Sequence, residues 1–307
     1  MRLKRKNITR KKKEIATAIY LYQVDYDGEW GEIYFDFVNR TTEIRKLAEW
    51  DRMISKVFSK KAICYIQTHP LLVNLASFFK THHLKMLSYN ALIFFNMKGT
   101  RAEKDAVLAQ LDEIVRRCRM LGCGMIVVVP SMDLKTPATR GEIRTDAVAV
   151  LREMVKRVEP YGIKLSLEFC GCPTMSINRF EDAYAIVSEV DSPLVGLTLD
   201  QYHFHAMASS WDALEQADGK KIFVWHLNGM EDMPCGAAYN NDEKRLWPDE
   251  PGDCLDHRRY ADTLKKIGFT GDVCTIEVFR PTYYQLSNEE NIKIAAEITR
   301  RHVETYC

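Results

Sequence analysis

The amino-acid sequence predicts an α/β protein built as a closed (β/α)8 barrel, and three observations lead to this class. From about residue 33, short apolar β-rich runs alternate with longer segments at helical period. Runs such as residues 126–129 are almost wholly apolar, which is typical of parallel strands buried on both faces. The 307 residues, 46% of them hydrophobic, suit one such barrel with a full core.

The predicted elements of the first half follow this alternation. In chain order they are strand 33–38, helix 43–59, strand 62–66, helix 71–81, strand 84–91, helix 103–121, strand 125–130 and helix 144–159. Pro160 and Gly162 follow the last of these helices, as helix-stopping residues usually do. Because no linker interrupts the alternation, we expect residues 31–307 to form a single barrel domain with atypical N-terminal strands.

Each predicted strand of the second half ends in a potential metal ligand. The four residues are Glu168, Asp200, His226 and Glu277, and the helices predicted between and after them cover 180–190, 209–217, 255–267 and 288–304. In a parallel barrel the C-terminal strand ends point at one shared mouth, so residues far apart in sequence can converge there. A polar residue at one strand end is ordinary, but four at successive strand ends predict a shared metal site.

The spacing of these four residues agrees with a barrel. Glu168 and Asp200 are 32 residues apart and Asp200 and His226 are 26 apart, about one strand–helix unit each. The 51-residue gap to Glu277 is longer, and the surplus lies in the loop 228–253. Long loops after barrel strands usually cover the active site, so we expect this loop to be a lid or a substrate wall.

The donor set predicts the chemistry. Three carboxylates and one imidazole suit one divalent ion, with Mn, Zn, Co and Mg all open, and leave positions for substrate oxygens. Such an ion polarises a carbonyl as a Lewis acid. His203, three residues past Asp200, is placed to reach a substrate oxygen or a partner of the metal ligands.

Composition limits the partners. The 43 basic and 42 acidic residues give a net charge of +1, which lacks the global field of a nucleic-acid binder. No apolar stretch approaches the roughly 20 residues of a membrane helix. Nine cysteines without a C-x-x-C pair and without a secretory signal indicate reduced thiols in the cytoplasm. We expect a small-molecule substrate, no nucleic acid and no membrane, and a homo-oligomer is compatible with the sequence.

Residues 1–30 are a separate predicted segment, because eight of the first thirteen residues are basic. A charge block of this kind binds nucleic acid, serves as an address or stays solvated. We favour the last and expect a disordered basic extension, since no apolar run follows that would make a signal peptide.

Several motifs together resemble one family, the inosose isomerases of the xylose isomerase-like barrel superfamily. The motifs are residues 167–173, 199–207, 217–226, 245–248 and 277–284, and weaker similarity extends upstream to about residue 72. Asp200-x-x-His203 followed by Phe-His-Ala is fairly specific, and Glu277-Val-Phe-Arg-Pro is more so. The first seventy residues match poorly.

The resemblance implies isomerisation of 2-keto-myo-inositol to 1-keto-D-chiro-inositol through an enediolate. It also implies that Glu168, Asp200, His226 and Glu277 hold the ion. Either Glu168 or Glu277 would move the proton, His203 would steady a substrate oxygen, and Arg280 would bind a hydroxyl or brace the metal carboxylates. Trp247, in the predicted lid, is expected to contact the substrate.

Three other functions stay open from the sequence. A ketose 3-epimerase would use the same metal site. A DNA repair enzyme of the endonuclease IV type would share the fold, but it needs about three zinc ions with many more ligands, and the net charge is unfavourable. A non-catalytic barrel would result if the irregular N-terminal third did not close the sheet.

Overall fold

The computed structural model describes most of the chain from residue 86 onward and four short pieces before it. The described residues are 15–17, 25–26, 29–30, 37–38, 86–93, 100–132, 134, 137–236, 242–271, 273–286 and 288–306. The basic residues 1–13 and the elements predicted at 43–59, 62–66 and 71–81 lie outside these ranges.

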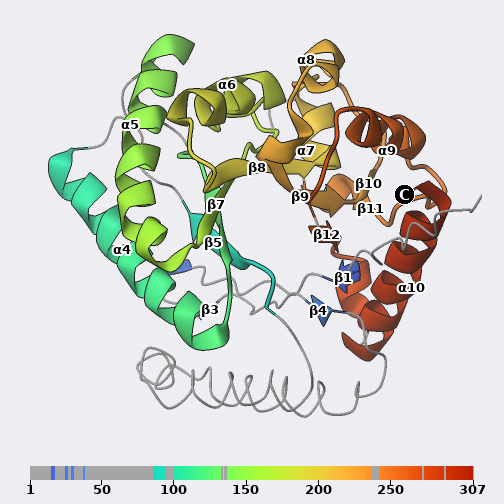
Figure 1. Ribbon diagram of the computed structural model, residues 1–307. Coiled ribbons are helices and arrows are strands. Elements are labelled where there is room, and N and C mark those ends of the chain that lie inside the picture. The colour runs from blue at the N-terminus through green and yellow to red at the C-terminus, as the bar shows by residue number, and fades with distance from the viewer. Residues whose placement is uncertain are drawn as a thin grey trace, which may run out of the picture.

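Six parallel strands form the main part of one curled sheet, in the order in which they occur along the chain. They are β5 (Tyr89–Ile93), β6 (Met125–Val129), β7 (Lys164–Glu168), β8 (Val195–Asp200), β9 (Ile222–Leu227) and β12 (Val273–Ile276). Each pairs parallel with the next. Figure 1 shows this sheet curving around an interior with the helices on its outside. The predicted class of fold, a parallel α/β barrel, is confirmed.

The helices connect these strands close to where the sequence places them. They are α4 (Arg101–Leu121), α5 (Arg140–Val158), α6 (Phe180–Val190), α8 (Trp211–Glu215), α9 (His257–Lys266) and α10 (Asn288–Tyr306). Helix α5 begins earlier than predicted because Thr139 and Glu142 make a capping box, in which each side chain bonds the other residue's backbone N–H. A short helix that was not predicted, α7 (Gln201–Ala206), follows β8 directly.

The N-terminal strands differ from the prediction. Strand β1 (Ile15–Thr17) pairs parallel with β12, although it falls inside the segment expected to be a basic extension. Of the barrel strand predicted at 33–38, the structure describes only residues 37–38, which form β4 (Phe37–Val38) and pair antiparallel on the outer side of β1. The place beside β12 is already taken by β1. Strands β2 (Asp25–Tyr26) and β3 (Glu29–Trp30) pair antiparallel in a separate two-stranded sheet.

Side chains of the parallel strands alternate between two environments. In β7, Leu165 and Leu167 pack in the core under the helices, whereas Ser166 is a buried polar residue whose hydroxyl lies 2.7 Å from the Thr198 hydroxyl of β8. In β9, the Trp225 ring packs edge-on against the His302 ring of α10, with ring centroids 5.7 Å apart. Apolar residues thus anchor the helices, and the intervening positions are left for the interior.

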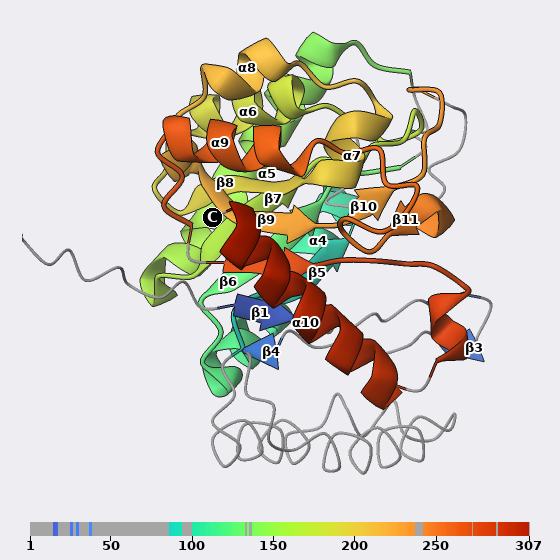
Figure 2. The same ribbon diagram turned by 90° about the vertical axis from the view of Figure 1, so that its right-hand side faces the viewer.

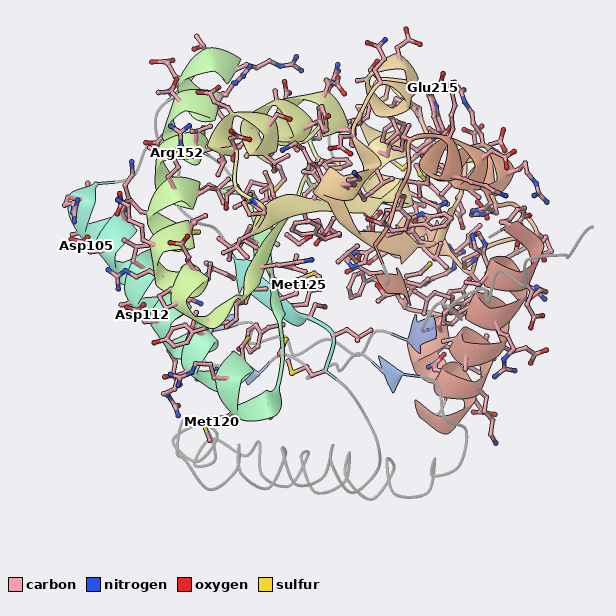
Figure 3. The ribbon with its side chains drawn as sticks, in the orientation of Figure 1. Asp105, Asp112, Met120, Met125, Arg152 and Glu215 are labelled. Carbon is pink, nitrogen blue, oxygen red and sulfur yellow. The ribbon has the colours of Figure 1, made fainter. Side chains whose placement is uncertain are left out.

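The same separation is visible in the side chains. Figure 3 shows Asp105, Asp112, Arg152 and Glu215 pointing outward from the helices, while Met125 lies inside the curve of the sheet. Among the residues that the structure describes, no helix is both long and apolar enough to cross a membrane.

Candidate metal centre

The strand register brings the four predicted ligands to one end of the interior. Asp200, the last residue of β8, is opposite His226 in β9. On the other side of His226 lies Thr275 of β12, and Glu277 follows that strand with its backbone N–H bonded to Leu227 O at 2.9 Å. Glu168 ends β7, one strand before Asp200. The ends of parallel strands therefore converge as the sequence predicts.

The ligand atoms of these residues are close together. His226 Nδ1 lies 2.9 Å from both Glu168 Oε1 and Glu277 Oε2, and 3.7 Å from Asp200 Oδ2. One ligand atom from each of the four residues lies within 4.8 Å of the others, and all four residues are buried. No further group of three or more such side chains is found in the described part of the chain.

This arrangement fits one divalent ion. Ligand atoms bound at about 2.0–2.3 Å around one ion lie about 3 to 4.6 Å from one another, as these atoms do. Glu277 Oε2 is buried and lies 2.9 Å from His226 Nδ1 and 3.7 Å from Arg245 Nη1, but it accepts no well-aligned hydrogen bond among the described residues, which leaves lone pairs for a cation. A buried carboxylate oxygen without such a bond is costly unless a cation compensates it.

Charge interactions within the site are strong. Although burial raises the pKa of Asp200, the Arg245 guanidinium and the two neighbouring imidazoles hold that pKa well below its usual value. Burial lowers the pKa of His226, but Glu277 and Glu168 outweigh it and raise that pKa well above the ordinary value. Burial raises the pKa of Glu277 to about 6. Without a metal ion, the imidazole proton balances part of the carboxylate charge, and a bound ion would replace it.

Arg245 is the residue of this site that the sequence reasoning missed. Its side chain is 1% exposed, and Nη1 donates to Asp200 Oδ2 at 2.8 Å and lies 3.7 Å from Glu277 Oε2. It comes from the predicted lid, where β10 (Gly229–Met230) and β11 (Arg245–Leu246) form a short antiparallel pair. Arg245 stands in the Arg-Leu-Trp-Pro motif, but its burial depends on this pairing of strands, which the motif does not indicate.

His203 is held at the site by the residue that begins helix α7. Asp200 Oδ1 accepts the His203 backbone N–H at 3.0 Å and so caps the helix. The imidazole Nε2 lies 3.2 Å from Arg245 Nη2. Because a guanidinium only donates, a hydrogen bond between these atoms requires the neutral tautomer with its lone pair on Nε2. Asn228 adds a further contact, donating from Nδ2 to Asp200 Oδ2 at 3.0 Å.

Of the two other predicted substrate ligands, Trp247 belongs to the lid and Arg280 contacts it. Arg280 Nη2 lies 2.5 Å from Glu231 Oε1, and its Nη1 donates to the backbone oxygens of Glu243 and Arg245. The Trp247 ring stacks on Tyr283 with centroids 4.9 Å apart. Bracing of the metal carboxylates, foreseen for Arg280, is made instead by Arg245, and substrate contact by Arg280 and Trp247 stays a prediction.

Figure 2 shows β10 and β11 beyond the ends of β8 and β9, at the same end of the sheet as α7. The β10–β11 pair, α7 and the ends of β8 and β9 thus surround one region. The metal ligands, His203 and Arg245 meet there.

The sequence is similar to those of known proteins. The sequence model described as xylose isomerase-like TIM barrel matches residues 46–302. An inosose isomerase of Bacillus velezensis is 41% identical over 242 residues, which is 79% of this chain and 84% of the relative. The inosose isomerase of Bacillus subtilis is 41% identical over 223 residues, 73% of this chain and 78% of the relative.

A solved structure is similar as well. A crystal structure of the IolI protein with a bound zinc atom has a TM-score of 0.74 and 40% identity, covering 79% of this chain and 84% of that one. A D-psicose 3-epimerase shares the fold at 14% identity and a TM-score of 0.56, covering 76% of this chain and 81% of its own.

Proposed function

Because the chain belongs to the xylose isomerase-like TIM-barrel family and is 41% identical to an inosose isomerase over 79% of its length, we propose that it is a metal-dependent inosose isomerase. The substrate would be 2-keto-myo-inositol and the product 1-keto-D-chiro-inositol. The observation that carries this proposal is the buried convergence of Glu168, Asp200, His226 and Glu277, with Arg245 and His203 beside them. A small polyol ketone is the class of substrate that such a polar, buried site accommodates.

The four converging residues would hold one divalent ion. When bound, that ion supplies Lewis-acid polarisation of a ketone and its neighbouring hydroxyl, which acidifies the adjacent C–H. Glu168 and Glu277 approach His226 Nδ1 from different strands at the same distance, 2.9 Å. Two carboxylates so placed can flank a substrate carbon, one taking the proton and the other steadying the site. Which glutamate is the base stays open.

Arg245 and His203 would act on the substrate oxygens. Both side chains are buried, so bulk water does not compete for the hydrogen bonds that they would make with the substrate. Arg245 donates only, whereas His203 can accept at Nε2 and donate at Nδ1. Together they can hold a hydroxyl and stabilise negative charge that develops on the neighbouring oxygen. Arg280 and Trp247 would line the entrance from the lid.

The test is NMR of 2-keto-myo-inositol in D2O with purified protein, first stripped of metal and then given zinc or manganese. We expect metal-dependent conversion with deuterium incorporation, and its loss in Glu277→Gln and Glu168→Gln. The variant that loses deuterium exchange while retaining metal identifies the base.

Failure of the metal-loaded, folded wild type to convert the inosose would overturn this function. Tagatose and fructose serve as the next substrates, since inversion at carbon three gives products different from carbonyl transposition. Turnover of these alone would assign the chain to ketose epimerisation.

A further inference from the structure

One carboxylate in the lid binds several of its backbone segments at once. Asp253 Oδ1 accepts the backbone N–H of Met230 and that of Leu255, both at 3.0 Å. Asp253 Oδ2 accepts the N–H of Asp249 at 3.0 Å and lies 2.6 Å from His257 Nε2. The side chain is 4% exposed. Strand β10, the turn before Asp253 and the start of α9 are therefore joined at this one group.

The backbone of β10 is shaped to admit this carboxylate. A Cβ atom added at Gly229 would lie 2.6 Å from Asp253 Oδ2 and 2.8 Å from the Trp247 carbonyl oxygen. Real side chains do not make contacts that short, so only glycine allows the approach. The backbone of the adjacent Met230 makes two hydrogen bonds to this segment. Its N–H donates to Asp253 Oδ1, and its carbonyl accepts the Cys254 N–H at 2.9 Å. Asp253 thus belongs to the construction of β10.

The charge on Asp253 strengthens these bonds. Burial raises the pKa of this carboxyl, but the bond from His257 and the backbone N–H donors outweigh burial and lower the pKa overall. A buried ionised acceptor makes stronger hydrogen bonds than a neutral one.

Strand β10 connects this group to the metal centre. In the β10–β11 pair, Met230 is opposite Arg245 and Gly229 is opposite Leu246. The Arg245 backbone is therefore fixed by the strand that Asp253 holds, and its side chain reaches Asp200 Oδ2 at 2.8 Å and His203 Nε2 at 3.2 Å. Small displacements of β10 would move the guanidinium relative to both.

We propose that Asp253 is a positioning residue that sets the place of the Arg245 guanidinium over the metal centre through the β10–β11 pair. It touches neither substrate nor ion and acts through Arg245. The effect on turnover rests on the proposed isomerase function, but the placement of Arg245 does not.

A double-mutant cycle tests this coupling. Asp253→Asn keeps the size of the side chain and replaces an acceptor oxygen by a donor, which cannot face these N–H groups. We expect kcat/KM for the inosose to fall by about 10- to 100-fold, the range seen when a residue that orients a group of the active site is replaced. In the Arg245→Ala background, the same change should cost less than about twofold, because the residue it positions is gone.

Asp256→Asn is the matched control. Asp256 is an exposed residue of the same segment whose side chain caps α9 by accepting the Arg259 N–H at 2.9 Å, and asparagine caps equally well. We expect wild-type kcat/KM. Losses from Asp253→Asn and Arg245→Ala that simply multiply would overturn the proposal.

A second measurement does not need catalysis. The Nε–Hε NMR signal of Arg245, assigned by its absence in Arg245→Ala, should shift or broaden in Asp253→Asn and stay in place in Asp256→Asn. An unchanged signal in folded Asp253→Asn would overturn the proposal even if the protein proved to have another activity. If Asp253→Asn does not fold, His257→Phe removes one bond of the four and should move the same signal in part, and no movement there would count equally against the proposal.

Discussion

Arg245 Nη1 lies 2.8 Å from Asp200 Oδ2, so a buried cation shares a carboxylate with the centre that would hold the metal ion. The ion and the guanidinium therefore divide the negative charge of the three carboxylates between them. Replacing Arg245 should therefore destabilise the folded protein most when the ion is also absent.

We predict that Arg245→Met lowers the free energy of unfolding of the metal-free protein by about 3–5 kcal/mol, since it leaves buried carboxylate charge unpaired. With saturating zinc the loss should be smaller. Urea unfolding with a chelator and with zinc measures both values. Arg152→Met, which removes an exposed arginine bonded to the Glu189 carbonyl, should stay within about 0.5 kcal/mol of wild type. Equal losses with and without zinc for Arg245→Met would contradict the charge argument.

Asp200 has two tasks that two substitutions separate. Asp200→Asn keeps a side chain that can cap α7 but removes the charge, so zinc affinity should fall by more than the roughly 10- to 100-fold typical of an outer partner. Asp200→Ala should lose zinc equally and also cost about 1 kcal/mol of stability through the missing cap. Calorimetric zinc titration and urea unfolding in chelator provide the two numbers. Equal stability of the two variants would show that the cap contributes nothing.

Gly171 controls the place of His203. A Cβ atom at this position would lie 2.6 Å from the His203 carbonyl oxygen and 2.8 Å from its Cα, so helix α7 must move in Gly171→Ala. A shift of about 1 Å at an acting group can cost about 100-fold in rate. We predict a loss of this order in kcat/KM, measured with the inosose. Gly124→Ala adds its methyl where nothing lies within 4 Å and should keep wild-type activity.

The buried His302 predicts an acid-sensitive stability. Burial, with His257 nearby, lowers its pKa to about 3, and neither ring nitrogen makes a hydrogen bond within the described part of the chain. The unfolded chain binds this proton near pH 6.5, so stability is full above that pH and declines as pH falls toward 3. The slope is about 1.4 kcal/mol per pH unit for one such group.

His302→Leu should flatten this decline. Urea midpoints at pH 7.5, 6 and 5 give the slope for each protein. The prediction concerns the difference between wild type and variant, because other groups titrate identically in both. Parallel slopes would mean that His302 is solvated or protonated in the folded state.

The features predictable from the sequence are those with a local periodic signal. The six parallel strands β5, β6, β7, β8, β9 and β12 and the helices between them have this signal. The ligand positions follow from the rule that the ends of parallel strands meet. His226 and Asp200 are opposite each other because both end apolar runs of parallel strands. These relations need no knowledge of the loops.

The features that the sequence did not reveal depend on pairing between distant segments. Arg245 is buried because β11 pairs with β10 across the lid, and nothing in the residues around it announces that. Strand β1 is three residues long and follows a dense basic segment, so its apolar signal is too short to stand out. The start of α5 is different, since Thr139 and Glu142 form a capping box that is a local signal in the sequence.

Asp200 offers Oδ1 to the His203 N–H, while Oδ2 faces His226 and Arg245. The metal centre and the start of α7 are thus joined by one side chain within a segment of four residues. Gly171 and Arg245 act on the same histidine only through contacts from other segments of the chain. One side chain therefore serves both the ion that the centre would hold and the backbone of His203, so a change at Asp200 would disturb the two together.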